Sequence, residues 1–466
     1  MPYADLRAFL ADLEAAGELT RVSAEVDTEY ELGAIARRSL ALGGIERNQG
    51  IFFERPRGFD VPVACNLLTS RQRYYRALGT TRERLFDDWV RRTEQPLPPR
   101  IVRDGPCQAH VLEGDAVDLH AWPIPIWNER DGGRFITMPF DVTRDPVTGT
   151  MNCGVYRSMV HSRNTLGIFV SAYRGLIQHA RPVLARGEPF PVAIAVGLDP
   201  VLYVAALGTF PHGVDEMAMA GALREEPVDL VRCVTLPLEV PAAAELVLEC
   251  VLLPDVREEE GPFGEFTGYY GERGPRPVLR VQAITHRDQP IYEATYVGRP
   301  PDTNAVCTAI PREIELRRQF GAQGLLDVNL CGGGCMFVAV AQIAKRYEGQ
   351  AKSLGASILG SFTGRIVKTV FVVDEDIDPF NWTDVEWALG TRFQPERDLD
   401  VLREMAGSTL DPSAPAEERQ PLGGRTSKAI VDLTKPVHRE FPVAVEPHSA
   451  TLERVSADWI RYGFPY

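Results

Sequence analysis

The chain has 466 residues, of which 44% are hydrophobic and 24% are charged, and its formal net charge at pH 7 is −14. These proportions are typical of a globular protein with two or three domains and a substantial core. The acidic balance argues against a nucleic-acid partner, which requires a basic face, although a local arginine can still attract a small anionic substrate.

The first hundred residues predict a mixture of helices and strands. An apolar stripe at helical spacing begins at Leu6 and ends before Gly17, a residue suited to a helix C-cap. The elements expected after it are a strand, a helix and two short strands, at 20–26, 31–42, 51–54 and 61–65. Four prolines within residues 94–107 indicate a linker.

From about residue 120 to residue 300 the pattern is mostly β. Short runs of strand-forming residues, separated by turn signals, occur at 135–138, 192–196 and 278–281. One helix, over 171–186, is expected to interrupt them. Several short strands at regular spacing favour a barrel or a sandwich.

After Pro300 and Pro301, strands and helices alternate, which predicts a second α/β domain. Strands are expected at 336–343 and 369–373, and helices at 312–320, 347–359 and 383–389. The last two predicted elements are a loop rich in Pro, Ser and Gly at 405–425 and a short helix at 456–466.

Several kinds of protein are disfavoured by what the sequence lacks. No apolar run approaches the roughly 18 residues of a membrane-spanning helix, and no signal peptide is visible. The eight cysteines show no disulfide spacing, and Cys331 and Cys335 lack the second pair or histidine that a zinc site needs, so we expect a reduced, cytoplasmic protein. The motifs of nicotinamide enzymes, kinases and α/β-hydrolases are absent.

The segment Glu260-Gly-Pro-Phe-Gly-Glu265 holds two carboxylates five residues apart and cannot be helical. A turn here could aim both carboxylates into one pocket, where burial and like charge raise one pKa toward neutrality. A general acid working at pH 7 needs such a shift. The alternative is a solvated acidic loop, since Glu258 and Glu259 come directly before it.

Asn152 and Arg157 form a second candidate group. In a continuous strand they would lie on opposite faces, so that one could contact a cofactor and the other a substrate. Arginine offers a planar fork to a carboxylate, and asparagine offers an amide oxygen to a metal ion. An edge strand with an ordinary exposed arginine is the alternative.

Three further residues could serve a metal or an anion. His179 lies on the predicted helix and Glu216 in a predicted loop, and with Asn152 they would make a mixed nitrogen and oxygen ligand set suited to Mn²⁺. A lone helical histidine is more often structural, however. Lys368 comes just before a predicted strand, where a phosphate could bind.

Taken together, these motifs resemble the UbiD family of prenylated-flavin-dependent decarboxylases nearly from end to end. The matching segments, specific through their order and spacing, are 3–10, 17–19, 131–137, 152–157, 260–265, 268–269, 298–302, 368 and 432–436. The resemblance implies a multi-domain α+β and α/β fold with four parts. These are an N-terminal α+β region (1–115), a split β-barrel prenylated-FMN domain like that of flavin reductases (116–305), a linker helix region (306–330) and a C-terminal α/β oligomerisation domain (331–466).

The resemblance also implies the reaction. The expected activity is reversible, non-oxidative decarboxylation of a small aromatic, heteroaromatic or α,β-unsaturated acid, with prenylated FMN as the electron sink. Arg157 would engage the substrate carboxylate and pair with Glu260, while Glu265 would donate the proton that replaces CO₂. Phe266 stands where the ubiquinone branch of the family carries a different residue, which disfavours a prenylated 4-hydroxybenzoate.

The cofactor site follows from the same resemblance. Asn152, His179 and Glu216 would bind Mn²⁺ or Mg²⁺ at the cofactor phosphate, with K⁺ nearby, and Gln178 and Lys368 would also contact the cofactor. A flavin prenyltransferase would supply the cofactor, and homodimers or homohexamers are expected. Two other functions stay open: a flavin-binding subunit of a larger carboxylase assembly, inactive alone, and an ordinary FMN oxidoreductase.

Overall fold

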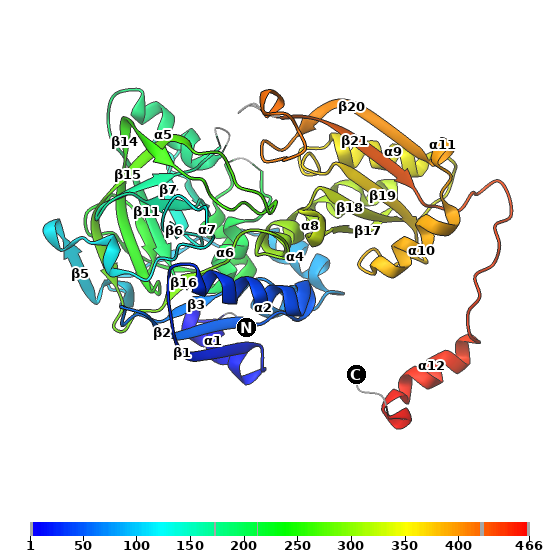
Figure 1. The fold of residues 1–466 in the computed structure, drawn as a ribbon, viewed down its shortest axis with the longest axis horizontal. Helices are drawn as coiled ribbons and strands as arrows, with labels where there is room; N and C mark the ends of the chain where they lie inside the picture. Colours follow the sequence, from blue (N-terminus) through cyan, green and yellow to red (C-terminus); the bar gives the residue numbers. More distant parts are fainter. Residues whose placement is uncertain (1–2, 172–173, 212, 420–423, 464–466) are drawn as a thin grey trace.

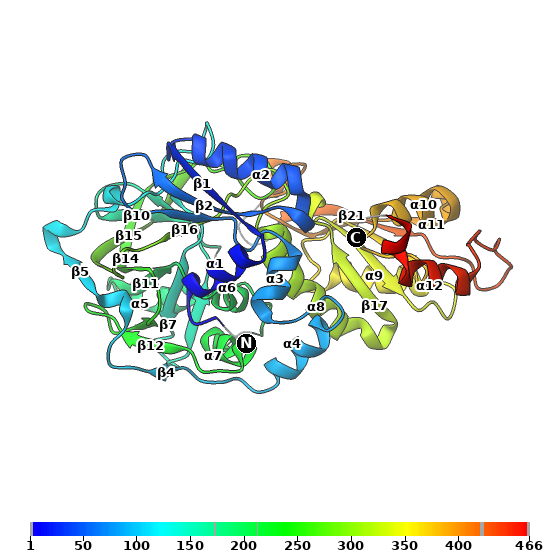
Figure 2. The same ribbon diagram turned by 90° about the horizontal axis from the view of Figure 1, so that it is seen from below.

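A computed structural model describes residues 3–171, 174–211, 213–419 and 424–463. The chain forms a larger, β-rich lobe and a smaller C-terminal α/β lobe, and both views place helix α8 (Ala309–Phe320) between them (Figures 1 and 2). The predicted mixed α/β, multi-domain fold is confirmed. In the described part of the chain, no helix is long and apolar enough to cross a membrane.

The N-terminal elements agree with the prediction but include two helices that it missed. Asp5 caps α1 by accepting a hydrogen bond from the Ala8 amide at 2.9 Å, and Gly17 follows the helix with φ +70°. The elements are α1 (Leu6–Ala15), β1 (Leu19–Val26), α2 (Glu31–Arg47), β2 (Gly50–Pro56), β3 (Val63–Cys65), and the missed helices α3 (Arg71–Leu78) and α4 (Leu85–Thr93). Together with β16 (Tyr292–Ala294), three of these strands form a four-stranded sheet of order β1-β2-β3-β16.

A nine-stranded sheet organises the β-rich lobe. Its order is β6-β9-β10-β15-β14-β11-β7-β8, with β5 attached to β15. The strands are β5 (His110–Glu113), β6 (Phe135–Ile136), β7 (Phe140–Arg144), β8 (Met151–Gly154), β9 (Ser158–Val160), β10 (Thr165–Ile168), β11 (Phe190–Val196), β14 (Leu246–Glu260) and β15 (Gly274–His286). Among the described residues no pairing joins β6 to β8, so the flavin-reductase-like split barrel stays a prediction.

Both faces of this sheet are covered by core. Alternate residues of β11 belong to different clusters: Ala193 and Ala195 pack on one side, and Val192, Ile194 and Val196 pack on the other. A smaller sheet in the same lobe joins β4 (Arg100–Ile101), β12 (Asp229–Arg232) and β13 (Glu239–Pro241), so part of the predicted 94–107 linker is a strand.

The helix expected at 171–186 is confirmed as α5 (Gly175–Leu184), but the expectation that it is the single helix between residues 120 and 300 is wrong, because the described residues there also form α6 (Pro200–Ala206) and α7 (Glu216–Arg224). All seven residues of α6 are buried, so its sequence lacks the periodicity of an amphipathic helix. Glu216 is the first residue of α7 rather than part of a loop, and Asp215 caps that helix by accepting hydrogen bonds from the Met217 and Ala218 amides.

The C-terminal lobe is built on a five-stranded sheet of order β17-β18-β19-β21-β20. Its strands are β17 (Leu325–Leu330), β18 (Val338–Ile343), β19 (Thr369–Asp374), β20 (Leu399–Gly407) and β21 (Gly424–Asp432), and its helices are α9 (Gln350–Gly360), α10 (Trp382–Arg392) and α11 (Pro395–Asp398). The predicted loop at 405–425 is therefore partly strand, and its residues 420–423 lie outside the described residues. The C-terminal helix, α12 (Ser449–Ala457), begins earlier than predicted.

Candidate active site

Arg157, Glu260 and Glu265 meet in one cluster. Glu260 is the last residue of β14, and Glu265 lies in the loop that leads to β15. Arg157 Nε lies 3.2 Å from Glu260 Oε1, and Arg157 Nη1 donates a hydrogen bond to Glu265 Oε1. Because β8 ends at Gly154, Arg157 stands in the following loop, so the expectation of one continuous strand from Asn152 to Arg157 is wrong.

The loop after β14 is held by backbone hydrogen bonds that fix the place of Glu265. The Glu265 amide donates to the Tyr269 carbonyl at 3.0 Å, and the Gly268 amide donates to the Glu265 carbonyl at 2.8 Å. The Gly264 amide donates to Asp131 Oδ1 at 2.9 Å. Gly268 has φ +79°, and a Cβ there would come within 3.1 Å of the Arg299 backbone. These contacts therefore give the loop a defined shape.

Both carboxylates of the segment are buried, so the alternative of a solvated acidic loop is wrong. Glu260 is 0% exposed and Glu265 is 5% exposed, whereas Glu258 and Glu259 are exposed. Burial raises the pKa of the Glu265 carboxyl; the Arg157 guanidinium opposes this rise and the Glu260 carboxylate adds to it. A raised carboxyl pKa favours the protonated form that a general acid needs.

The Arg157 guanidinium lies among aromatic rings as well as carboxylates. Its central carbon is 4.2 Å from the centroid of the Phe169 ring and 4.7 Å from that of Phe263. Burial alone would lower the pKa of Arg157, but the carboxylates of Glu265 and Glu260 outweigh it and the pKa is raised. Arg157 is therefore a permanent cation with a fixed orientation.

Sequence reasoning missed Arg276, which joins the same cluster from β15. Its Nε lies 3.6 Å from Glu260 Oε2, and its guanidinium carbon is 4.8 Å from the centroid of the Phe169 ring. In the β14–β15 ladder Arg276 is paired with Glu258, two residues before Glu260. The signal that could have predicted this hairpin pairing is the acidic run at 258–260, which is followed after a short turn by Arg273 and Arg276.

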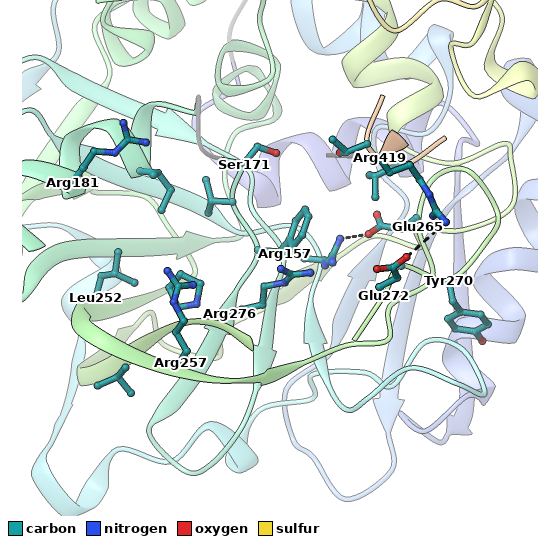
Figure 3. A pocket seen from close by; sticks show the side chains of 18 of the residues that line it. Arg157, Ser171, Arg181, Leu252, Arg257, Glu265, Tyr270, Glu272, Arg276 and Arg419 are labelled. Carbon is teal, nitrogen blue, oxygen red and sulfur yellow. Dashed lines mark hydrogen bonds and ion pairs between the residues drawn. The ribbon is translucent and has the colours of Figure 1, made fainter. Parts of the chain in front are cut away.

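A cavity of about 890 Å³ opens beside the cluster (Figure 3). Arg157, Glu265 and Arg276 contribute to its wall, together with parts of α5, β14 and the loop after Glu265. Segment 409–419 of the C-terminal lobe also lines the cavity, and Arg419 lies 3.7 Å from Glu272. The cavity is thus lined by residues of both lobes, and it is large enough for a drug-sized ligand.

The three predicted metal ligands lie around strands β7 and β8. Asn152 is paired with Thr143 in the ladder, and the Thr143 hydroxyl lies 3.2 Å from His179 Nδ1. The Cys153 amide donates to Glu216 Oε2 at 3.1 Å, which places this carboxylate next to Asn152 along β8. None of the three lines the cavity. The structure thus brings the three residues to the same two strands, which face His179 within α5 and Glu216 at the start of α7.

This donor set fits a divalent cation. Asn152 offers an amide oxygen and Glu216 a carboxylate, and burial raises the pKa of Glu216 to about 7, a cost of burying charge that a bound cation would offset. No group of three His, Cys, Asp or Glu side chains in the described ranges could hold a metal, so the amide of Asn152 would be needed. An amide, an imidazole and a carboxylate suit Mn²⁺ or Mg²⁺.

The two other predicted cofactor contacts are not at the cavity wall. Gln178 lies on α5 beside His179, while Ile177 and Arg181 of the same helix line the cavity. Lys368 stands just before β19, as predicted, and its Nζ lies 2.8 Å from Asp411 Oδ2. Because Asp411 adjoins the cavity-lining Leu410 and Pro412, Lys368 supports this part of the wall.

Three family models match the chain in order. They describe the N-terminal, Rift-related and C-terminal domains of 3-octaprenyl-4-hydroxybenzoate carboxy-lyase, or UbiD, and they match residues 10–93, 100–300 and 305–433. The three matches together cover most of the chain.

Solved structures agree with the family models. The UbiD-class enzyme HmfF from Pelotomaculum thermopropionicum, in complex with FMN, is 34% identical with a TM-score of 0.89, over 97% of this chain and 99% of that chain. An evolved dimeric form of HmfF in complex with prFMN is 32% identical with a TM-score of 0.84, over 96% and 99%. The vanillic acid decarboxylase of Sedimentibacter hydroxybenzoicus, in its open form, is 31% identical with a TM-score of 0.88, over 99% and 100%.

Proposed function

Because the chain belongs to the UbiD family of flavin-dependent carboxy-lyases, we propose that it decarboxylates a small aromatic, heteroaromatic or α,β-unsaturated carboxylic acid with prenylated FMN. The observation that carries the proposal is the buried Arg157, Glu260 and Glu265 cluster at the cavity wall. It combines a cation that can hold a carboxylate with a carboxyl group whose pKa is raised by burial.

Each residue of the cluster has a separate role in this reaction. Arg157 binds the substrate carboxylate with its planar fork, and Glu260 holds Arg157 through Nε, a different nitrogen from the Nη1 that contacts Glu265. Glu265 then exchanges its contact with Arg157 for one with the substrate and delivers a proton to the carbon that has lost CO₂. Prenylated FMN, when bound, supplies the electron sink for cleavage of the carbon–carbon bond. The same proton transfer runs backward at high CO₂, so weak carboxylation is expected.

Asn152, His179 and Glu216 would hold the divalent ion, Mn²⁺ or Mg²⁺, that fixes the cofactor phosphate, with K⁺ close by. Gln178 and Lys368 would complete this end of the cofactor site. Support comes from the shared location of the three ligands at β7 and β8 and from the donor types that they offer. The two HmfF structures contain FMN or prFMN, which is the class of ligand that such a site would anchor.

Assembly into a homodimer or homohexamer is part of the proposal. An evolved form of one relative, HmfF, is described as dimeric. In this chain, no side chain of α12 is buried, and α12 lies away from the C-terminal sheet at the end of an extended segment (Figure 1). Size-exclusion chromatography with light scattering would report the mass, and a monomer at micromolar concentration would contradict this part.

The test is CO₂ release by the purified protein, matured with prenylated FMN from a flavin prenyltransferase and offered a panel of aromatic, heteroaromatic and acrylic acids. Activity of the protein alone would exclude the inactive-subunit alternative. Release of CO₂ that survives both Arg157→Ala and Glu265→Gln would overturn the proposed mechanism. NAD(P)H turnover with unmodified FMN would favour an ordinary oxidoreductase instead.

A further inference from the structure

The buried Glu260 carboxylate lies between two arginines, only one of which the proposed mechanism uses. Arg157 Nε is 3.2 Å from Oε1, and Arg276 Nε is 3.6 Å from Oε2. Both guanidinium groups pack over the same Phe169 ring, at 4.2 Å and 4.8 Å. Figure 3 shows Arg276 beside Arg157 at the cavity, and both line its wall.

The contact between Glu260 and Arg276 leaves hydrogen-bonding capacity unused. Glu260 Oε2 and Arg276 Nε are buried atoms that make no hydrogen bond within the described ranges, and their separation of 3.6 Å is too long for one. The Arg276 side chain is 30% exposed, toward the cavity. Its charge is thus only partly used by Glu260, and it stands where a ligand can approach.

Counting charges shows what this arrangement requires. When Glu265 carries the proton that the proposed function has it donate, the cluster holds two guanidinium cations and one carboxylate, Glu260, which leaves one positive charge in excess. A substrate carboxylate cancels that excess. During decarboxylation the substrate loses its negative charge as neutral CO₂, and Glu265 loses its proton to the substrate carbon. Two positive and two negative charges are therefore present before and after the reaction.

We propose that Arg276 is a charge-balancing residue: it supplies the positive charge that the substrate carboxylate neutralises on binding and that the Glu265 carboxylate neutralises after proton transfer. Without Arg276 the cluster would carry one net negative charge both with the substrate carboxylate bound and after proton transfer from Glu265. A net negative charge disfavours anion binding in a poorly solvated cavity. The inference rests on the proposed function, because it takes Glu265 as the proton donor.

The groups around Glu265 agree with this role. Its pKa is raised by burial and by Glu260, and both Arg157 and Arg276 oppose the rise. Removal of Arg276 therefore raises the pKa of Glu265 further, whereas a distant arginine has no such effect. Arg273 is a matched control: it lies just before β15 in the same hairpin, is 63% exposed, pairs with Glu259 at 3.2 Å and does not line the cavity.

The first experiment measures carboxylate recognition by calorimetry on the full chain reconstituted with FMN. Benzoate is compared with benzamide, a neutral analogue of the same shape, for the unsubstituted protein and for Arg276→Gln, Arg276→Lys and Arg273→Gln. Arg276→Gln is expected to weaken benzoate binding about tenfold or more and benzamide binding less than about twofold. Arg276→Lys keeps the charge and should restore most of the benzoate affinity, and Arg273→Gln should change neither.

Two outcomes would overturn the inference. One is equal benzoate affinity for Arg276→Gln and the unsubstituted protein. The other is an unsubstituted protein that does not prefer benzoate to benzamide, since a site with an excess positive charge must prefer the anion. Neither measurement involves turnover, so a failure of the proposed function, seen as no CO₂ release from any acid, is separate from a failure of this inference.

A second measurement uses no ligand. Carbon-13 NMR of protein labelled at the glutamate carboxyl carbons, with Glu265→Gln to assign the signal, reports the pKa of Glu265. The pKa should rise in Arg276→Gln and stay unchanged in Arg273→Gln. A merely structural role of Arg276 would leave the Glu265 titration in place, and that result would also contradict the inference.

Discussion

Arg157 and Glu260 form a buried ion pair, with 3.2 Å between Nε and Oε1, that ties the loop after β8 to the end of β14. Glu260 is 0% exposed, so its charge depends on its arginine partners for compensation. The pair also sets where Arg157 presents its remaining nitrogens, one of which reaches Glu265. Site geometry and local stability thus depend on the same contact.

Replacing Arg157 by alanine should therefore destabilise the protein as well as inactivate it. A buried carboxylate that loses its main partner typically costs about 3 kcal/mol in the free energy of unfolding. The double variant Arg157→Ala/Glu260→Gln removes the charge as well and should recover part of that loss. Urea unfolding of the unsubstituted protein, both single variants and the double variant checks this; equal stability of Arg157→Ala and the double variant would argue against the pair.

Glu265→Gln should lower the rate of CO₂ release by about 100-fold or more, because an amide cannot donate the proton to the substrate carbon. The side chain keeps its size and can still contact Arg157, so FMN affinity and melting temperature should change little. Steady-state kinetics with the best acid of the panel provides the measurement. A loss of less than tenfold, with unchanged folding, would assign the proton donor elsewhere.

The rate of decarboxylation should fall as pH rises. Burial raises the pKa of Glu265, so its protonated form persists above the ordinary range of a carboxyl group and is lost as pH passes its pKa in the folded protein. The same sign holds for stability: a carboxyl group with a raised pKa favours folding at low pH, and this contribution disappears as pH rises through that pKa. Rate–pH profiles with melting temperatures at each pH separate the two effects; a rate that rises steadily with pH would contradict the assignment.

Glu216→Gln should weaken Mn²⁺ binding about 10-fold to 100-fold and lower FMN affinity with it, because the phosphate would lose its metal anchor. Glu225→Gln is the matched control, because Glu225 lies at the other end of the same helix, is 51% exposed and pairs with Arg91 at 2.7 Å. Elemental analysis and flavin fluorescence titration report the two affinities. Equal metal content in Glu216→Gln and Glu225→Gln would remove Glu216 from the ligand set.

Much of the fold was predictable because local signals and burial agree. The helix that begins at Leu6 has a cap and an apolar stripe, and β19 contains a continuous apolar run at 370–373. The helix α6 was not predictable in this way, since a segment buried on every side shows no period. The loop assigned to Glu216 failed for a related reason: the Pro and Gly before it mark a turn, but the cap at Asp215 begins a helix at once.

The sequence by itself determined the family, the main elements and the candidate residues, because short motifs in a particular order carry that information along the chain. The tertiary structure decided which of them meet. It joined Arg157 to Glu260 and Glu265, placed Asn152, His179 and Glu216 along β7 and β8, and added Arg276. The burial of a carboxyl group, the compensation of its charge and its pKa all depend on neighbours that are distant in sequence. Only the pairing of strands and the approach of the two lobes bring those neighbours together.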